Sequence, residues 1–276
     1  MSIKLILLDL DGTLLTGDKK ISPANYDALE RCAAAGVHIV PSTGRFYGGM
    51  PQVVRDLPFV RYVVAINGAR IHDVKEDKVL CREEIDLEAA FRVYDELDKL
   101  PVIYDCYMGS SGYDDAAMYE RIDEFISDPR VNAMVKGTRK PVPDFRAFLR
   151  EQGCPLQKIQ MFFKDMDRRA RELERLPKLF PDLVVTSSSA NHIEFNAKNA
   201  NKGEALRFLC RHLGLDVSES MSFGDSSNDL SMIVAAGIGV AMANADRAVL
   251  EAADYVTDTN DNDGVAKAIA KFCPEI

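Results

Sequence analysis

The chain has 276 residues and a formal net charge of −9, and 47% of its residues are hydrophobic. This length and composition allow one large domain or two ordinary ones, and the negative charge argues against nucleic acid or an anionic membrane as a partner. The sequence shows neither a signal-peptide pattern nor an apolar run long enough to span a membrane, so we expect a cytoplasmic protein. Its six cysteines include no C-x-x-C pair, which disfavours a zinc or redox site.

The two ends of the chain share one alternating pattern of strands and helices. Apolar runs at 3–8, 37–41 and 62–66 predict strands, and a helix begins after Ser22 and ends at Gly36. After residue 200 the pattern predicts helix 202–213, strand 221–223, helix 229–236, strand 239–242, helix 245–253 and strand 255–257. This alternation is typical of an α/β fold, here a Rossmann-like, doubly wound parallel sheet with helices on both faces.

The middle of the chain lacks this regular alternation. Its patterns predict helix 87–100, strand 102–108, a helical segment at 115–126, a basic, breaker-rich connection at 136–143, helix 144–151, strand 156–163, helix 165–180, and strands 183–187 and 192–196. We therefore expect an inserted α+β cap domain at 84–190. The catalytic core would then consist of 1–83 together with 191–276.

Two carboxylates follow the first predicted strand directly. Asp9 and Asp11 are two residues apart, so their side chains leave an extended chain in the same direction. Gly12 allows a sharp exit from the strand, and Thr13 can donate a hydrogen bond to a nearby carboxylate. An ordinary Asp-rich turn would have the same composition.

Three further segments place polar residues at element ends. Residues 42–45, Ser-Thr-Gly-Arg, offer a hydroxyl and backbone N–H groups to a phosphate oxygen, and Lys202 begins a helix whose N-terminus attracts anions. Asp225 follows a strand, and Asp229 lies in the next helical turn. Each segment also has an ordinary explanation. Residues 42–45 could be a plain strand-end turn, Lys202 a solvated surface lysine, and the acidic residues at 225 and 229 helix caps.

Together, these segments predict a metal site. The carboxyl ends of parallel strands are where α/β sheets bind ligands, and four carboxylates gathered there would repel one another without a cation. The carboxylates are Asp9, Asp11, Asp225 and Asp229. Oxygen ligands without a histidine or cysteine cluster favour Mg²⁺ over zinc.

The motifs resemble those of the haloacid dehalogenase superfamily. They are Asp-Leu-Asp-Gly-Thr at 9–13, Ser-Thr-Gly-Arg at 42–45, the Lys202 helix and Gly-Asp-Ser-Ser-Asn-Asp at 224–229, in that order. The long insert between the second and third motifs and the Asn-Gly-Ala turn at 67–69 resemble the Cof-type sugar-phosphatase branch with a type IIB cap.

The resemblance implies a phosphatase with an aspartyl-phosphate intermediate. Asp9 would attack the phosphoryl group, and Asp11 would protonate the leaving alcohol and then activate water. Lys202 and Thr43, with Ser42 as the alternative to Thr43, would hold the phosphoryl oxygens.

The resemblance also implies the remaining site residues. Mg²⁺ would be held by the carboxylates of Asp9 and Asp225 and the backbone carbonyl of Asp11, and Asp229 would orient a metal-bound water or Lys202. The further residues expected to bind phosphate or substrate are Leu10, Gly44, Arg45, Asn67 and Asn228. Lys198 competes with Lys202 for the phosphate role, although Lys202 opens the clearer helix.

The expected substrate is a small phosphorylated metabolite. The resemblance suggests a hexose phosphate, with pyridoxal phosphate or flavin mononucleotide as further choices. Within the expected cap domain, Asp105 and Tyr107 are the candidates for contacting the leaving group. Two other functions stay open on the same scaffold: a phosphomutase or phosphotransferase, and a non-catalytic phosphosugar-binding regulator.

Overall fold

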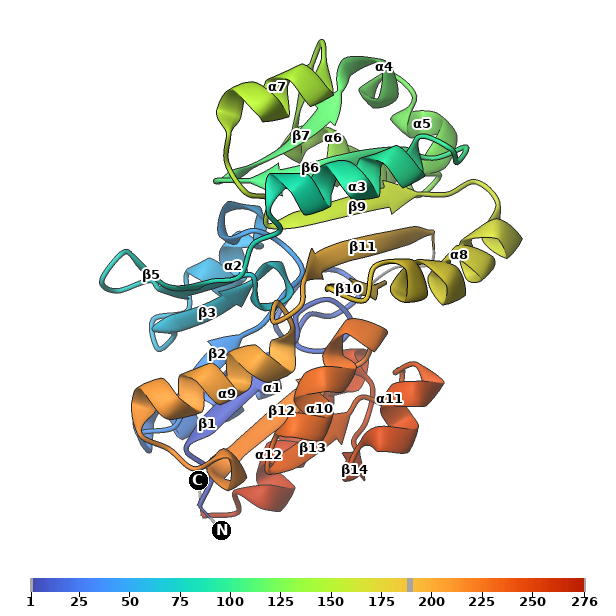
Figure 1. The fold of residues 1–276 in the computed structure, drawn as a ribbon. Coiled ribbons are helices and arrows are strands. Elements are labelled where there is room, and N and C mark those ends of the chain that lie inside the picture. The colour runs from blue at the N-terminus through green and yellow to red at the C-terminus, as the bar shows by residue number, and fades with distance from the viewer. Residues whose placement is uncertain (1, 188–190, 276) are drawn as a thin grey trace. The chain divides into compact units, whose positions relative to one another are not determined.

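A computed structural model describes residues 2–187 and 191–275, and the chain divides into two compact units. The core unit contains Met1–Arg82 and Asn201–Ile276, and the cap unit contains Glu83–Ala200 (Figure 1). We expected the core to resume at residue 191, next to residues 188–190, which lie outside the described part. It resumes at Asn201 because β11 (His192–Ala197) pairs with a neighbouring strand of the cap unit on each side.

The core unit is built on a five-stranded parallel sheet, which confirms the expected α/β class. Its strands, in spatial order, are β14 (Tyr255–Val256), β13 (Ile238–Ala241), β12 (Ser220–Gly224), β1 (Leu5–Leu8) and β2 (His38–Pro41). The last residue of β1, Leu8, is level with Phe223 of β12 and Pro41 of β2. The segments that follow these three strands therefore begin at one edge of the sheet.

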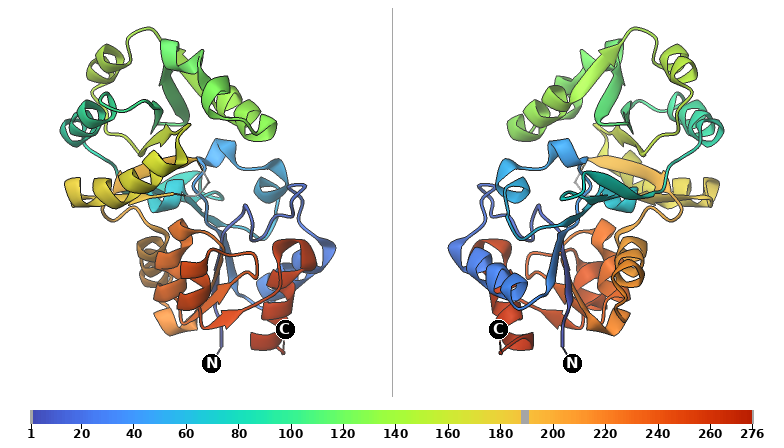
Figure 2. Two further views of the ribbon diagram at one scale, coloured as in Figure 1. Left: turned by 90° about the vertical axis from the view of Figure 1, so that its right-hand side faces the viewer. Right: turned by 90° about the vertical axis from the view of Figure 1, so that its left-hand side faces the viewer.

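Helices cover both faces of the core sheet because every residue of β1 is apolar and buried. Ile6 and Leu8 pack in a cluster with α1 (Pro23–Ala34) and α12 (Gly264–Phe272). Leu5 and Leu7 pack on the other face with α9 (Lys202–Leu213) and α10 (Leu230–Ala235). Figure 2 shows these two helical layers on opposite sides of the sheet. Two further helices of the core unit are α2 (Gln52–Arg55) and α11 (Arg247–Ala252).

The predicted strand at 62–66 does not extend the parallel sheet. β3 (Tyr62–Ala65) forms a separate antiparallel sheet with β4 (Arg70–Asp73) and β5 (Lys78–Arg82). The chain turns back at once after β3, and so short a connection joins antiparallel strands, whereas a parallel pair needs a crossover of a dozen residues or more. An isolated parallel bridge joins Val64 of β3 to Ser42.

The cap unit contains a six-stranded mixed sheet and several helices, in agreement with the expected α+β architecture. Its strands, in spatial order, are β10 (Leu183–Thr186), β11, β9 (Lys158–Phe162), β6 (Ile103–Met108), β7 (Ser111–Asp115) and β8 (Arg139–Val142). Its helices are α3 (Leu87–Leu97), α4 (Ala116–Tyr119), α5 (Ile122–Phe125), α6 (Pro129–Thr138), α7 (Phe145–Gln152) and α8 (Met166–Leu179). The expected connection at 136–143 thus forms the end of α6 and the edge strand β8. Across both units, none of the helices in the described ranges is long and apolar enough to cross a bilayer.

Candidate functional site

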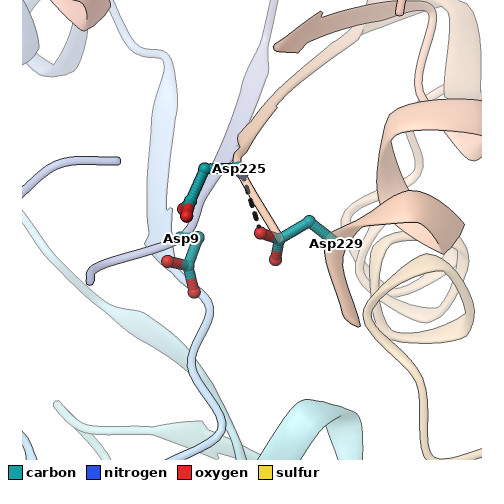
Figure 3. A group of neighbouring side chains, drawn as sticks. All are labelled: Asp9, Asp225 and Asp229. Atoms are coloured by element: carbon teal, nitrogen blue, oxygen red, sulfur yellow. Dashed lines mark hydrogen bonds between the residues drawn. The ribbon is translucent and has the colours of Figure 1, made fainter. Parts of the chain in front are cut away.

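Three carboxylates meet at the carboxyl edge of the core sheet. Asp9 follows β1, Asp225 follows β12, and Asp229 ends a short 3-10 turn at Ser227–Asp229 before α10. Each offers an oxygen within 4.8 Å of the other two (Figure 3). The neighbouring positions of β1 and β12 explain this convergence, and the backbone N–H of Asp9 donates to Phe223 O at 3.0 Å. Asp11 does not join this group of carboxylates.

Lys202 reaches this cluster from the start of α9. Asn201 caps the helix by accepting a hydrogen bond from the Glu204 amide, which fixes Lys202 as the first helical residue. The Lys202 side chain is fully buried, and its Nζ donates to Asp9 Oδ1 at 2.5 Å and to Asp229 Oδ1 at 2.6 Å. Lys198, the alternative from the sequence, is exposed. Of these two lysines, the structure places Lys202 against Asp9.

Asp229 is held by donors of the protein through both of its oxygens. Oδ1 accepts from Lys202, and Oδ2 accepts from the backbone N–H groups of Asp225 at 2.9 Å and Ser226 at 3.0 Å. The arrangement suits a carboxylate that orients Lys202 and shapes the loop. Asp9 Oδ2, in contrast, accepts no hydrogen bond from the part of the chain that the structure describes.

Gly12 makes room for Asp225. Its φ of +91° lies in the region that favours glycine, and a Cβ built on it would lie 2.5 Å from Asp225 Oδ2. The next residue, Thr13, is buried and donates from its hydroxyl to Asp225 Oδ1 at 2.8 Å. Gly12 and Thr13, the last two residues of the first motif, therefore position the carboxylate of Asp225 in the fourth motif.

Burial dominates the electrostatics of the three-carboxylate cluster. It raises the pKa of Asp9 well above the ordinary value; Asp229 and Asp225 raise it further, and Lys202 acts in the opposite direction. Burial and the charge of Asp229 raise the pKa of Asp225 to about 6. For Lys202, burial lowers the pKa, but Asp229 and Asp9 outweigh it and raise the pKa overall. A bound cation would favour the ionised carboxylates.

Two cations hold the side chain of Asp11. Arg45 donates from Nε to Asp11 Oδ2 at 2.8 Å and from Nη2 to Oδ1 at 3.0 Å, and Lys19 Nζ donates to Oδ1 at 2.7 Å. Burial alone would raise the pKa of Asp11, but Arg45 and Lys19 lower it overall. Sequence reasoning missed Lys19, which lies in the polar loop after the first motif and carries no motif signal.

The residues predicted to bind phosphate lie close to one another on neighbouring loops. Thr43 is buried, and its Oγ1 accepts from the backbone N–H of Arg45 at 3.2 Å. Asn228 donates from Nδ2 to Asn67 Oδ1 at 3.1 Å, and a Cβ on Gly44 would lie 3.1 Å from the same Oδ1.

Two other predicted phosphate-binding residues differ in what they offer. The Ser42 hydroxyl is buried and makes no hydrogen bond within the described ranges, while the Ser42 carbonyl accepts from Lys202 at 3.1 Å. The Leu10 side chain is fully buried in the apolar core, so it leaves only its backbone for ligand binding.

The cap candidates belong to a buried polar network within the cap sheet. Asp105 Oδ2 accepts from Arg139 Nε and from Gln160 Nε2, both at 2.8 Å, and the Arg139 guanidinium lies 4.6 Å from the Tyr107 ring centroid. Asp114 is directly opposite Asp105 on the neighbouring strand, and burial, then the charge of Asp105, raises its pKa to about 8. Sequence reasoning missed Arg139 because the breaker-rich composition of 136–143 predicts a connection, whereas Arg139 begins the edge strand β8.

The donor set of the core site fits Mg²⁺. Asp9 and Asp225 supply carboxylate oxygens at the edge of the sheet, and neither histidine nor cysteine belongs to the cluster. Mg²⁺ prefers a few carboxylates together with water and phosphate oxygens, whereas catalytic zinc sites usually include histidine.

Comparisons with known proteins show what this chain is similar to over nearly its whole length. The family model described as haloacid dehalogenase-like hydrolase matches residues 6–269. Phosphatase YwpJ of Bacillus subtilis is 32% identical, covering 96% of this chain and 98% of its own length. The 5-amino-6-(5-phospho-D-ribitylamino)uracil phosphatase YcsE of the same organism is 33% identical, covering 98% and 95%. A solved haloacid dehalogenase-like hydrolase from B. subtilis has a TM-score of 0.85 at 30% identity, covering 98% of this chain and all of that one.

Proposed function

Because this chain belongs to the haloacid dehalogenase-like hydrolase family, we propose that it is a Mg²⁺-dependent phosphatase that hydrolyses small phosphomonoesters. One observation carries the proposal: the buried Lys202 ammonium contacts Asp9 beside a second carboxylate, Asp225, at the carboxyl edge of the sheet. This contact supports the proposed roles of Asp9 as nucleophile and of Lys202 as the cation that binds phosphate.

Asp9 is the nucleophile of the proposed reaction. Its carboxylate attacks phosphorus, the bond from phosphorus to the leaving oxygen breaks, and an aspartyl-phosphate forms. Water then attacks the phosphorus of this intermediate and releases inorganic phosphate and free Asp9. Lys202 and the Thr43 hydroxyl hold phosphoryl oxygens and offset their charge in both steps.

Asp11 is the proposed acid and base. It gives a proton to the leaving alkoxide and accepts one from the attacking water. In the structure its carboxylate is paired with Arg45 and Lys19. Asp11 must therefore turn from these two cations, or they must move, before it can reach a leaving group.

The carboxylates of Asp9 and Asp225 and the backbone carbonyl of Asp11 would hold Mg²⁺, while Asp229 orients Lys202. When bound, Mg²⁺ supplies positive charge that offsets the charge of the phosphoryl oxygens.

The proposed substrates are phosphate esters of sugars or other small polyols. One relative, 33% identical over nearly the whole chain, is named for a substrate with a phosphorylated ribityl chain, which is a polyol phosphate. We place the protein in the cytoplasm, where such phosphorylated metabolites occur.

A phosphatase screen tests the proposal. Sugar phosphates, nucleotides, pyridoxal phosphate and flavin mononucleotide are incubated with the protein, with and without Mg²⁺, and inorganic phosphate is measured. Mg²⁺-dependent release that disappears in Asp9→Asn supports hydrolysis. Isomerisation of glucose 1-phosphate without release indicates a phosphomutase, and inactivity on every ester in the presence of Mg²⁺ contradicts the proposal.

A further inference from the structure

The turn after β3 has an unusual backbone. Ile66, Asn67 and Gly68 are consecutive residues with φ values of 53°, 54° and 102°. Asparagine and glycine tolerate this left-handed region, but a β-branched residue such as isoleucine rarely adopts it. Strained conformations of this kind persist where surrounding contacts impose them, and they concentrate at functional sites.

Backbone contacts attach this turn to two of the predicted phosphate-binding segments. The Asn67 amide donates to Thr43 O at 2.9 Å, and the Ile66 amide donates to Arg45 O at 3.0 Å. On the other side, a Cβ on Gly68 would lie 2.6 Å from the carbonyl oxygen of Asn201, the cap of the Lys202 helix. The turn therefore lies against the segments that carry Thr43 and Lys202.

The Asn67 side chain contacts a third predicted segment of the site, residues 224–229. It is buried, with 2% of the residue exposed, and its Oδ1 accepts from Asn228 Nδ2 at 3.1 Å. Asn228 lies in the loop between the two acidic residues Asp225 and Asp229. One buried residue thus joins the loop of Thr43, through its backbone, to the loop of Asn228, through its side chain.

We propose that Asn67 is a positioning residue that acts through Asn228 and fixes the loop at 224–229 relative to the loop at 42–45. This inference rests on the proposed phosphatase function, because the Thr43 and Asn228 side chains would then contact the same phosphoryl group. Asparagine suits the position since it combines tolerance of the left-handed conformation with a short side-chain acceptor. The sequence predicted a substrate-binding role for Asn67, and the inference replaces that role with an indirect one.

A double-mutant cycle tests the inference on the full chain. Asn67→Gly keeps the positive φ without strain and removes the side-chain acceptor, so we expect it to fold and to lower kcat/KM about tenfold, the size expected for one lost hydrogen bond. In an Asn228→Ala background, the same replacement is expected to change kcat/KM by less than about twofold, because the contact it removes is already absent. Asp77→Gly is the matched control: Asp77 is exposed, has φ 48° and lies in the turn between β4 and β5, outside the predicted site residues, so its replacement should leave kcat/KM unchanged.

The outcomes separate the possible failures. A tenfold fall in both backgrounds would overturn the inference, because Asn67 would then act independently of Asn228. If the parent chain releases phosphate from no ester, the proposed function has failed, and the cycle has nothing to measure. Hydrogen exchange on Asn228→Ala gives a second test that needs neither turnover nor a folded Asn67 variant. Faster exchange of the Ile66 and Asn67 amides than in the parent supports the inference, and unchanged exchange overturns it.

Discussion

Replacing Lys202 by methionine removes the ammonium group from the cluster while keeping an unbranched side chain. In the structure, Lys202 Nζ contacts Asp9 Oδ1 at 2.5 Å and Asp229 Oδ1 at 2.6 Å, and the lysine is fully buried. Loss of one preorganised charge contact to the transition state costs about 3–4 kcal/mol, which is at least a hundredfold in turnover. We therefore expect Lys202→Met to lower kcat by a hundredfold or more.

The same replacement also affects stability. Removing one partner of a buried ion pair leaves an uncompensated charge and typically costs about 3–5 kcal/mol. Without its lysine, the cluster keeps three carboxylates in mutual proximity. We expect a lower urea midpoint for Lys202→Met in the absence of divalent cations, and a partial recovery when Mg²⁺ is added, because the cation supplies part of the missing positive charge.

Lys198→Met is the matched control, since Lys198 is exposed. Phosphate release is measured for the parent and both variants on the best substrate of the screen, with saturating Mg²⁺ and at a temperature where all three are folded. Turnover of Lys202→Met within tenfold of the parent would refute the reasoning. A hundredfold fall in Lys198→Met, with Lys202→Met unaffected, would assign the phosphate role to Lys198.

Three further predictions concern other side chains. Gly12→Ala places a Cβ 2.5 Å from Asp225 Oδ2, so we expect weaker Mg²⁺ binding by calorimetry, and unchanged affinity would contradict the packing argument. Asp114 has a pKa raised to about 8, so the folded chain holds a proton that the unfolded chain releases, and stability falls as pH rises between about 4 and 8. This contribution to the pH dependence of the unfolding free energy is at most about 1.4 kcal/mol per pH unit. Urea denaturation at several pH values should show that it is lost in Asp114→Asn. An unchanged dependence on pH would place the proton on another group. Asp11→Asn should lower turnover about a hundredfold or more with Mg²⁺ affinity retained, and full activity would exclude Asp11 as acid and base.

The sequence predicted the family and the core because both depend on short motifs and on the periodicity of single strands and helices, which can be recognised within one stretch of the chain. The family expectation is confirmed by the match over residues 6–269, and the alternating strands and helices are those of a parallel sheet. Asp9, Asp225 and Lys202 each follow or open a regular element, and parallel strands end at one edge. The structure brings these three residues together for that reason. Their catalytic roles remain predictions.

What the sequence did not predict depends on pairing between distant segments. The apolar run 62–66 would suit a parallel or an antiparallel strand equally well, and the short turn after it decides the outcome. The basic segment 136–143 contains the strand that carries Arg139, whose partner Asp105 lies 34 residues earlier. Lys19 contacts Asp11 only because the loop between them folds back. Such contacts follow from tertiary structure rather than from periodicity.

Lys202, at the start of α9, neutralises only part of the negative charge of the acidic cluster. Asp9, Asp225 and Asp229 can carry three negative charges, and Lys202 contributes one positive charge. The remaining two charges match those of a single divalent cation. A ligand that binds only the folded state stabilises it in proportion to the logarithm of its concentration. If Mg²⁺ binds there as proposed, it would contribute part of the folding free energy of the core unit, and added Mg²⁺ should raise the urea midpoint of the parent chain.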